Sequence, residues 1–267
     1  MKHPIKTLKK DFLKIKIFET RRDLGIAAAC DLASIIKPLF EKQDYVNIVF
    51  ASAPSQQEFL EEFCKYNDIE WRRINAFHMD EYLGLPVDAP QRFGNFLKTR
   101  LFDKQPFHSV HYLNGDNSID EECMRYTELL RKYPIDIACL GIGENGHIAF
   151  NDPHVADFND LYWVKKVTLD NICRQQQVND GCFNRLNDVP PHALTLTISA
   201  LRQARYFLCM VPGSTKANAL FHTYTDKISE TVPSTCLRLL NYSAIYADTE
   251  SASLLLNHVK ITVDPQK

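Results

Sequence analysis

Residues 139–153 read CLGIGENGHIAFNDP, and they place a strand, a glycine-rich turn and titratable side chains in direct succession. The apolar run Ile135–Leu140 leading into the turn is short enough for a buried strand. Glycines at three nearby positions let the backbone turn sharply and approach a ligand closely. His147, Asn151 and Asp152 follow at once. Because open α/β sheets carry active sites at the carboxyl ends of their strands, the segment predicts an α/β protein with a site here.

The glycine spacing fits two other interpretations. Gly141, Gly143 and Gly146 match the G-x-G-x-x-G fingerprint of dinucleotide sites, in which a helix opening at the third glycine holds the pyrophosphate. Pro153 follows too soon for the usual helix, and several strand–helix units precede the motif, which disfavours a nicotinamide cofactor. In the other interpretation the turn binds no ligand, and His147 only satisfies local hydrogen bonds.

Composition and charge exclude several classes of function. A net charge of −2 over 267 residues gives no electrostatic basis for binding nucleic acid or an anionic membrane. No apolar run approaches the ~20 residues of a membrane span, and the lysine-rich stretch up to Lys16 lacks the apolar core and cleavage site of a signal peptide. The eight cysteines include no Cys-x-x-Cys pair, which predicts reduced thiols, no zinc cage and a cytoplasmic protein. Assembly into a homo-oligomer is compatible with these features.

Strand and helix patterns alternate along the chain. The strands that we expect are Val46–Ala51, Ile74–Met79, Val110–Leu113, Ile135–Leu140, Tyr162–Leu169, Ala193–Ile198, Tyr206–Val211 and Ala244–Ala247. The helices that we expect are Thr20 to Lys42, Ser55 to Tyr66, Phe93 to Leu101, Ser118 to Lys132, a short one at Pro233 and a terminal one from Glu250. The pairs Thr20–Asp23, Ser55–Glu58 and Ser118–Glu121 have the spacing of helix caps.

This alternation, without a repeat or a linker, predicts a single domain over residues 1–267 with one doubly wound, mostly parallel sheet flanked by helices. The pattern weakens over about 154–190, where a strand and a Gln-rich helix are expected to cover the site. The turns at Ser52, Asp80, His147 and Lys216 all follow strands, so they are predicted to meet at one edge of the sheet.

Three of these turns carry side chains with clear chemical uses. Ser52-Ala53-Pro54-Ser55 offers hydroxyls and a helix N-terminus, which suit an anion, and Lys216 at a helix start suits a phosphate. Asp80 and Glu81 at a strand end form a candidate acid/base pair. Plainer interpretations stay open: a simple N-cap, a solvated lysine and solvated surface carboxylates.

Longer segments resemble a known family. FHMDEYLGLP at 77–86 and LGIGENGHIAFNDP at 140–153 resemble the two signature segments of the glucosamine-6-phosphate deaminases (isomerases). PHALT at 191–195 and PGSTKA at 212–217 fit two further family segments, and the resemblance spans roughly 46–253 in unbroken order. It implies a modified Rossmann-like sheet, no cofactor, no catalytic metal, and conversion of an amino-sugar phosphate to a keto-sugar phosphate and ammonia.

The same resemblance implies a role for each site residue. Asp80 would move a proton from C2 to C1 through an enediolate, and His147 would open the pyranose ring. Asn145 and Asp152 occupy the positions of the neighbours that orient this histidine. Because the family usually has Glu at the second position, Asp152 is expected to reach His147 by a backbone adjustment or a bridging water. The predicted substrate-binding residues are Ser52, Ala53, Ser55, Glu81, Gly146 and Lys216, the last holding the phosphate.

The phosphate-binding part departs from the family. Ala51-Ser52-Ala53-Pro54-Ser55 stands where the family has Thr-Gly-Gly-Thr-Pro, so both glycines are lost. The position of the family's phosphate-binding arginine falls near Asn179, with Arg174 and Arg185 as the nearest replacements. Two alternatives therefore stay open: a lactone hydrolase like the 6-phosphogluconolactonases, which share the fold, and a non-catalytic sugar-phosphate sensor. The lactonases usually lack the MDEY segment and carry Gly-His-Thr where this chain has 146–148.

Overall fold

The backbone of the computed structural model is described for residues 2–263 and contains an eight-stranded sheet with the order β1-β2-β11-β10-β7-β3-β4-β6. Its strands are β1 (Lys6–Lys10), β2 (Leu13–Phe18), β3 (Val46–Phe50), β4 (Ile74–His78), β6 (Ser109–His111), β7 (Ile137–Leu140), β10 (Tyr206–Val211) and β11 (Ser243–Asp248). All neighbours are parallel except the pair β1–β2. The predicted doubly wound, mostly parallel sheet is confirmed.

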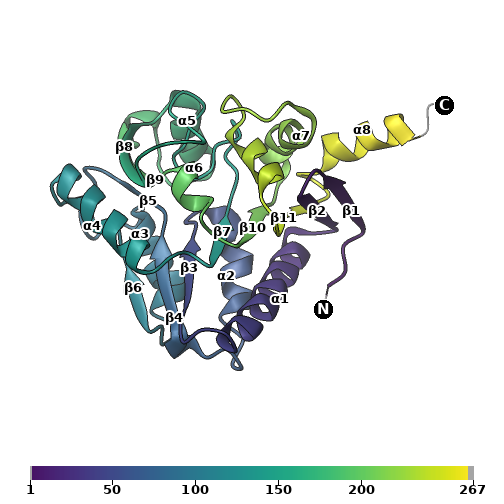
Figure 1. Cartoon of the computed structure of the whole chain (residues 1–267). Coiled ribbons are helices and arrows are strands. Elements are labelled where there is room, and N and C mark those ends of the chain that lie inside the picture. The colour runs from purple at the N-terminus through teal and green to yellow at the C-terminus, as the bar shows by residue number, and fades with distance from the viewer. Residues whose placement is uncertain (1, 264–267) are drawn as a thin grey trace.

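Helices cover both faces of this sheet (Figure 1). They are α1 (Arg21–Phe40), α2 (Gln57–Phe63), α3 (Phe93–Leu97), α4 (Ile119–Lys132), α5 (Asn171–Asn179), α6 (Ile198–Leu201), α7 (Ala217–Thr225) and α8 (Ser253–Val263). Alternate residues of β3 point to opposite faces: Ile48 and Phe50 pack with α1 and α2, whereas Val49 packs with α4, α6 and α7. The strand is therefore buried on both sides, as parallel sheets require.

A second, smaller sheet lies over the site end of the large one (Figure 1). It consists of β5 (Asp80–Tyr82), β9 (His192–Leu196) and β8 (Val164–Thr168), all antiparallel. The prediction of one sheet was wrong here, because two of the predicted strands belong to this second sheet. Burial patterns identify a strand but not its partners, so the sequence could not assign them. The predicted covering strand and helix exist as β8 and α5.

The hairpin β1–β2 was not predicted, although its signal is visible in hindsight. Leu13, Ile15 and Ile17 are fully buried, and Lys14 and Lys16 alternate with them on the opposite face. This period of two is that of a half-buried strand. The hairpin adds two strands to the sheet beside β11, so these lysine-rich residues have a structural role.

One of the three predicted helix caps is confirmed in full. The side chain of Thr20 accepts a hydrogen bond from Asp23 N (3.1 Å) at the start of α1. Ser55 instead lies inside a 3₁₀ turn (Pro54–Gln56), and Glu58 pairs with Arg21 (2.6 Å), so no capping box forms there. Ser118 precedes α4 but makes no capping hydrogen bond, and three acidic residues in the first turn favour the helix start electrostatically.

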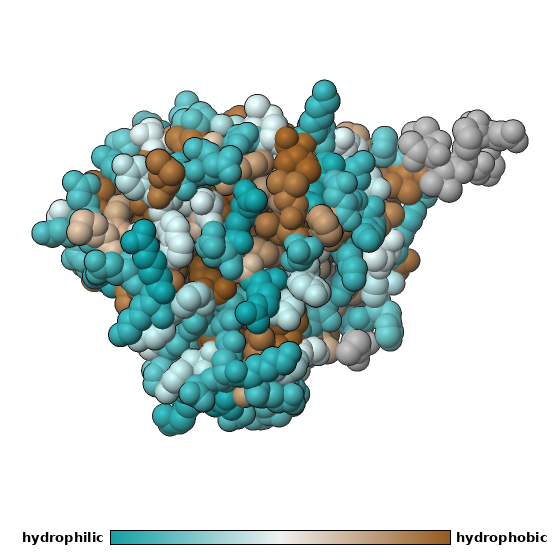
Figure 2. All heavy atoms as spheres, viewed as in Figure 1, coloured by the Kyte–Doolittle hydropathy of each residue, from teal (hydrophilic) through white to brown (hydrophobic). Residues whose placement is uncertain are grey.

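The remaining short elements are 3₁₀ segments and one wide turn. They are Trp71–Arg73, Leu186–Asp188, Ser214–Lys216, Pro233–Leu239 and a π-helical turn at Lys98–Phe102 that continues α3. Within residues 2–263, no helix combines the length and the apolar character needed to cross a bilayer. On the face shown in Figure 2, hydrophilic residues predominate and hydrophobic residues occur in patches between them.

Candidate active site

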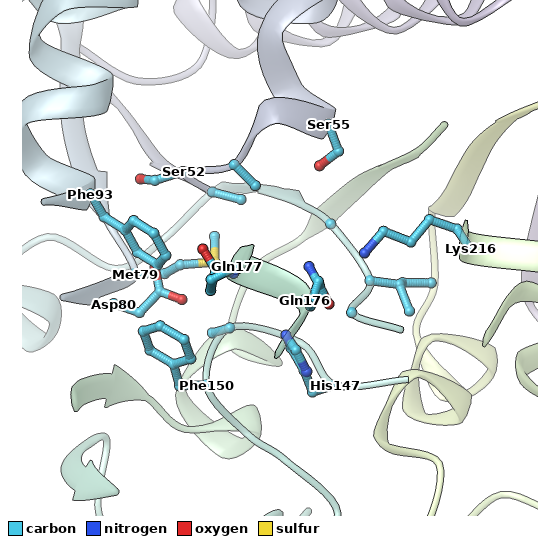
Figure 3. Close-up of a pocket in the computed structure, with 16 residues that line it drawn as sticks. Ser52, Ser55, Met79, Asp80, Phe93, His147, Phe150, Gln176, Gln177 and Lys216 are labelled. Carbon is cyan, nitrogen blue, oxygen red and sulfur yellow. The ribbon is translucent and has the colours of Figure 1, made fainter. Parts of the chain in front are cut away.

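The four predicted turns meet in one cavity beyond the carboxyl ends of β3, β4, β7 and β10 (Figure 3). Each turn contributes a lining residue: Ser52, Asp80, His147 and Lys216. The prediction that these turns share one edge of the sheet is therefore confirmed. The other lining side chains belong to Ala51, Ala53, Ser55, Met79, Phe93, Ile142, Ala149, Phe150, Gln176 and Gln177, and Gly141 and Gly143 complete the wall.

Asp80 is a buried carboxylate in an apolar setting. It is only 5% exposed, its Oδ1 has no hydrogen-bond partner, and the rings of Phe93 and Phe150, which stack on each other, line the cavity with it (Figure 3). Burial, together with the charge of Glu81, raises the pKa of Asp80 well above its usual value. Because the protonated and ionised forms then approach each other in energy nearer to neutral pH, this carboxyl group is suited to take and return a proton.

His147 is held from one side of its ring. Its Nδ1 lies 2.7 Å from Asn145 Oδ1 and 3.0 Å from Asp152 Oδ1. Asp152 thus reaches the imidazole directly, and the tight turn between them contains Ala149 in the left-handed conformation (φ 51°). The contact needs no bridging water. Since Nδ1 is engaged, Nε2 is the nitrogen that the ring offers to the cavity.

Asp152 is fully buried behind the imidazole. Burial alone would raise its pKa, but the hydrogen bond and charge of His147, with donors from Asn145 and Asp170, lower the pKa of Asp152 below its usual value. Asp152 is therefore an anion at neutral pH and accepts from Nδ1–H. With a lowered folded-state pKa, this group stabilises the fold above about pH 4, and the contribution is lost as the pH falls through the folded-state pKa.

Lys216 brings a buried positive charge to the opposite end of the cavity (Figure 3). It is 5% exposed, and within residues 2–263 no ion pair or hydrogen bond joins its Nζ to another group. Burial lowers the pKa of Lys216, while the charges of Asp180 and Glu144 oppose that effect. Burying an ammonium group without a partner costs free energy, and an anion bound beside it offsets that cost. This end of the cavity therefore favours an anionic ligand group.

The altered loop keeps two hydroxyls at the cavity. Ser52 Oγ is buried without a hydrogen-bond partner, and Ser55 Oγ accepts only from Gln56 Nε2 (3.1 Å). The same amide also donates to Leu140 O (3.3 Å), which joins the loop to the end of β7. Ser55 and Lys216 lie on the same side of the cavity (Figure 3). A hydroxyl and an ammonium group are therefore available to one anionic group.

Two residues predicted to bind substrate do not line the cavity. The Glu81 carboxylate accepts from Phe93 N (3.0 Å) and Gly94 N (2.9 Å), so it anchors the start of α3 and positions the Phe93 ring. Gly146 lies beside His147 with φ 84°, a left-handed conformation that favours glycine, and Val232 and Ser234 pack against it. Both residues hold parts of the cavity wall in place but do not line the cavity themselves.

Neither Arg174 nor Arg185, the nearest replacements for the family's arginine, lines the cavity. Arg174 donates to the carbonyls of Leu186 and Val189, and Arg185 is an exposed side chain paired with Asp188. On the covering helix α5, a pair of amides faces the cavity instead: Gln176 and Gln177. Arg174 is only three residues before Gln177 on α5, so the hydrogen bonds to backbone carbonyls, and not the helix face, account for its guanidinium being held elsewhere.

Several important residues were not singled out from the sequence. Gly143 is one: a Cβ at this position would lie 2.1 Å from the His147 ring, so only glycine leaves space for the imidazole. Phe93 and Phe150, stacked at 5.3 Å, form the apolar walls around Asp80. The glycine spacing drew attention to Gly143, but only the three-dimensional structure shows that the His147 ring fills the space a side chain would need. Phe150 lies in the signature segment and was taken as part of the turn.

The fold and the cavity define a Rossmann-like α/β protein whose site combines a buried carboxylate, an oriented imidazole and a buried ammonium group. Residues 19–244 match the family described as glucosamine-6-phosphate isomerases/6-phosphogluconolactonase. The chain belongs to this family of enzymes.

Relatives of known name agree with this assignment. The glucosamine-6-phosphate deaminases of Bacillus cereus (strain B4264) and Bacillus cytotoxicus (strain DSM 22905 / CIP 110041 / 391-98 / NVH 391-98) are 35% and 34% identical over 189 residues, 70% of this chain and 70% of theirs. A monomeric glucosamine-6-phosphate deaminase superposes with a TM-score of 0.81 at 27% identity, covering 90% of this chain and 99% of that one. The 6-phosphogluconolactonase of Thermotoga maritima, at a TM-score of 0.71 and 22% identity over 88% and 98%, shares the fold.

Proposed function

We propose that the chain is a glucosamine-6-phosphate deaminase, which converts an amino-sugar phosphate and water to a keto-sugar phosphate and ammonia. The observation that carries the proposal is the placement of two proton-transfer groups, Asp80 and His147, in the same cavity as the unpaired ammonium of Lys216. Named relatives with this activity support it. A phosphate at the Lys216 end places the sugar carbons toward Asp80 at the other end (Figure 3).

His147 opens the sugar ring. With Nδ1 held by Asn145 and Asp152, Nε2 takes the proton of the C1 hydroxyl and returns a proton to the ring oxygen as the C1–O5 bond breaks. The product is the open-chain aldehyde. Because Asp152 is an anion, it stabilises the imidazolium that forms between these two proton transfers.

Asp80 then carries out the isomerisation. Its carboxylate removes the proton from C2 while O1 takes up a proton that the sugar's ammonium group gives up, and the resulting enolamine is reprotonated at C1 by the same carboxyl group. C1 is thereby reduced from an aldehyde to a hydroxymethylene group, and C2 is oxidised to an imine. Water adds to the imine, and ammonia leaves to give the ketose. The raised pKa of Asp80 suits this double role, because it must accept and release one proton in each cycle.

A substrate panel tests the proposal. Glucosamine 6-phosphate, glucosamine and a 6-phosphogluconolactone are incubated separately with the enzyme, and ammonia, ketose and sugar acid are measured. We expect ammonia and ketose from glucosamine 6-phosphate only. Sugar acid from the lactone without ammonia from the amino sugar would replace the proposal with a lactonase. A ligand-dependent rise in Tm without any product would indicate a sensor.

Lys216→Met is expected to raise KM for glucosamine 6-phosphate by about tenfold or more, because a charge-assisted hydrogen bond contributes roughly 1.5–3 kcal/mol. Unphosphorylated glucosamine should bind poorly to both proteins. Steady-state kinetics with each sugar measure this. Lys227→Met, at an exposed lysine just after α7, serves as the matched control and should change nothing. An unchanged KM in Lys216→Met would remove the lysine from the phosphate site.

Asp152→Asn is expected to slow ring opening more than isomerisation, because the variant loses the anion that orients His147. Turnover of the cyclic sugar should fall, because no carboxylate then accepts from Nδ1–H and holds the ring. The rate on a substrate analogue fixed in the open-chain form should change little. Comparing rates on the two substrates measures this, and equal losses would assign His147 to a different step.

A further inference from the structure

Asp170 has no role in the steps above, yet it contacts the turn that carries His147 at two points. Its Oδ2 accepts a hydrogen bond from Asn145 Nδ2 (3.1 Å), and its backbone N donates to Asp152 Oδ2 (3.2 Å). Asn145 and Asp152 are the two side chains that hold the imidazole. We infer that Asp170 is a positioning residue, which fixes the side-chain amide of Asn145 and thereby couples the covering helix α5 to the orientation of His147.

The first step concerns which way the Asn145 amide points. Its Nδ2 has two N–H groups, and two carboxylate oxygens accept them: Asp152 Oδ1 at 3.0 Å and Asp170 Oδ2 at 3.1 Å. A flipped amide would set its oxygen against both carboxylates. It would also turn its N–H groups toward the backbone N–H of His147, which now donates to Asn145 Oδ1 (3.1 Å). Only the observed orientation satisfies every group.

The second step concerns the proton on the imidazole. Asn145 Oδ1 is an amide oxygen and can only accept, and it lies 2.7 Å from His147 Nδ1. Once Asp170 and Asp152 fix this oxygen in place, both groups that face Nδ1, Asn145 Oδ1 and Asp152 Oδ1 (3.0 Å), can only accept, so the neutral imidazole carries its hydrogen on Nδ1. Nε2 is then left unprotonated toward the cavity, which is the form that a base acting on the sugar hydroxyl requires. An Asn145 amide released to flip would instead turn an N–H toward Nδ1, which favours hydrogen on Nε2. Asp170 therefore acts on the imidazole through Asn145.

The third step concerns the covering helix. Asp170 is the N-cap of α5, and its Oδ1 accepts from Cys173 N (2.6 Å). Further along the same helix, Gln176 Oε1 accepts from the backbone N of Glu144, 2.9 Å away in the glycine turn. Both ends of the helix are thus hydrogen-bonded to the turn that carries His147. The Asp170 carboxylate therefore links the position of α5 to the imidazole. One of its oxygens accepts from the helix and the other accepts from Asn145.

Two variants separate this role from ordinary helix capping. Asp170→Ser keeps a good N-cap residue, but its shorter side chain cannot also reach Asn145. Asp170→Asn keeps the size, but its Nδ2 would face Asn145 Nδ2, which places two donors together. Thr20→Ala, which removes the cap of α1 on the other side of the sheet, is the control for loss of a cap alone.

The primary readout is nitrogen-15 NMR of His147 in the free protein, at a pH where the ring is neutral. Its signals among the nine histidines are assigned by their loss in His147→Gln. We expect hydrogen on Nδ1 in wild type and in Thr20→Ala, and a shift toward the Nε2–H form in both Asp170 variants. Tm of Asp170→Ser should stay close to that of wild type, because the cap is retained.

The second readout rests on the proposed function. In both Asp170 variants kcat for glucosamine 6-phosphate should fall by at least about tenfold with KM little changed, since carboxylates that fix an imidazole tautomer affect kcat strongly. An Nε2–H wild type, or Asp170 variants that keep both the wild-type NMR signature and kcat, would overturn the inference. The NMR result does not depend on the reaction, so failure of the deaminase assignment alone would leave it intact.

Discussion

Asp80→Asn should lower kcat by about 10²–10⁴-fold and leave KM within a few-fold of the wild-type value. The amide has nearly the same size and can take the same place in the cavity beside Phe93 and Phe150, but it cannot take the proton from C2. Steady-state kinetics with glucosamine 6-phosphate measure both constants. A variant that retains most of its kcat would remove Asp80 from the proton transfer and leave the isomerisation without a base.

The same substitution should stabilise the protein. Asp80 is buried with one oxygen unpaired, and its pKa is raised above the unfolded value. A group with a raised folded-state pKa favours folding less and less as the pH rises from about 4 through that pKa. Replacing it should therefore raise Tm by about 2–6 °C at neutral pH, and by less at low pH, where wild-type Asp80 is already protonated. A gain that is the same at every pH, or a fall in Tm, would contradict this account of Asp80.

Gly143→Ala should lower kcat by about 10²-fold, because the new methyl group would occupy the position of the imidazole. A Cβ at 143 would lie 2.1 Å from one ring atom of His147, so the ring must leave its place beside Asn145 and Asp152. Displacements of about an ångström in a reacting group cost this much in rate. The ring can turn away, so the fold should survive, and circular dichroism together with Tm checks this.

Gly141→Ala is the matched control in the same turn. Its Cβ would meet the Gln56 amide at 3.1 Å and Ser55 Oγ at 3.4 Å. Both atoms belong to side chains of the turn after β3, and both can move. Gly141→Ala should change KM more than kcat, whereas Gly143→Ala should change kcat more than KM. If the two alanines gave the same kinetic pattern, the imidazole would not be the group that Gly143 accommodates.

The sequence predicted those parts of the site in which a chemically reactive side chain comes after a recognisable strand. Asp80, His147 and Lys216 each lie in a segment that follows a buried strand, and parallel strands bring their carboxyl ends to one edge. The period of the hydrophobic pattern was therefore enough to place them in one cavity. The direct contact between Asp152 and His147 depends on the left-handed Ala149, and neither the sequence pattern nor the residue type indicates that conformation.

The covering segment was harder, for a physical reason. Asp170 and Gln176 act through single hydrogen bonds to Asn145 and to Glu144 N, which lie 25 and 32 residues away in the chain. No periodic pattern encodes such a pair. Likewise, β8 and β9 were recognised as strands, but the antiparallel pairing of β9 with β5 on one side and β8 on the other is fixed by the way this segment folds back over the site. Arg174 attracted attention by its charge, although its guanidinium donates to backbone carbonyls.

The most direct measurement uses glucosamine 6-phosphate labelled with carbon-13 at C1, followed by NMR while ammonia is assayed in the same sample. The account predicts that the C1 signal changes from a ring hemiacetal to a hydroxymethylene carbon, with one ammonia released for each sugar converted. Asp80→Asn should leave the label at the hemiacetal position. Ammonia without the change at C1, or wild-type enzyme that leaves both unchanged, would contradict the deaminase assignment.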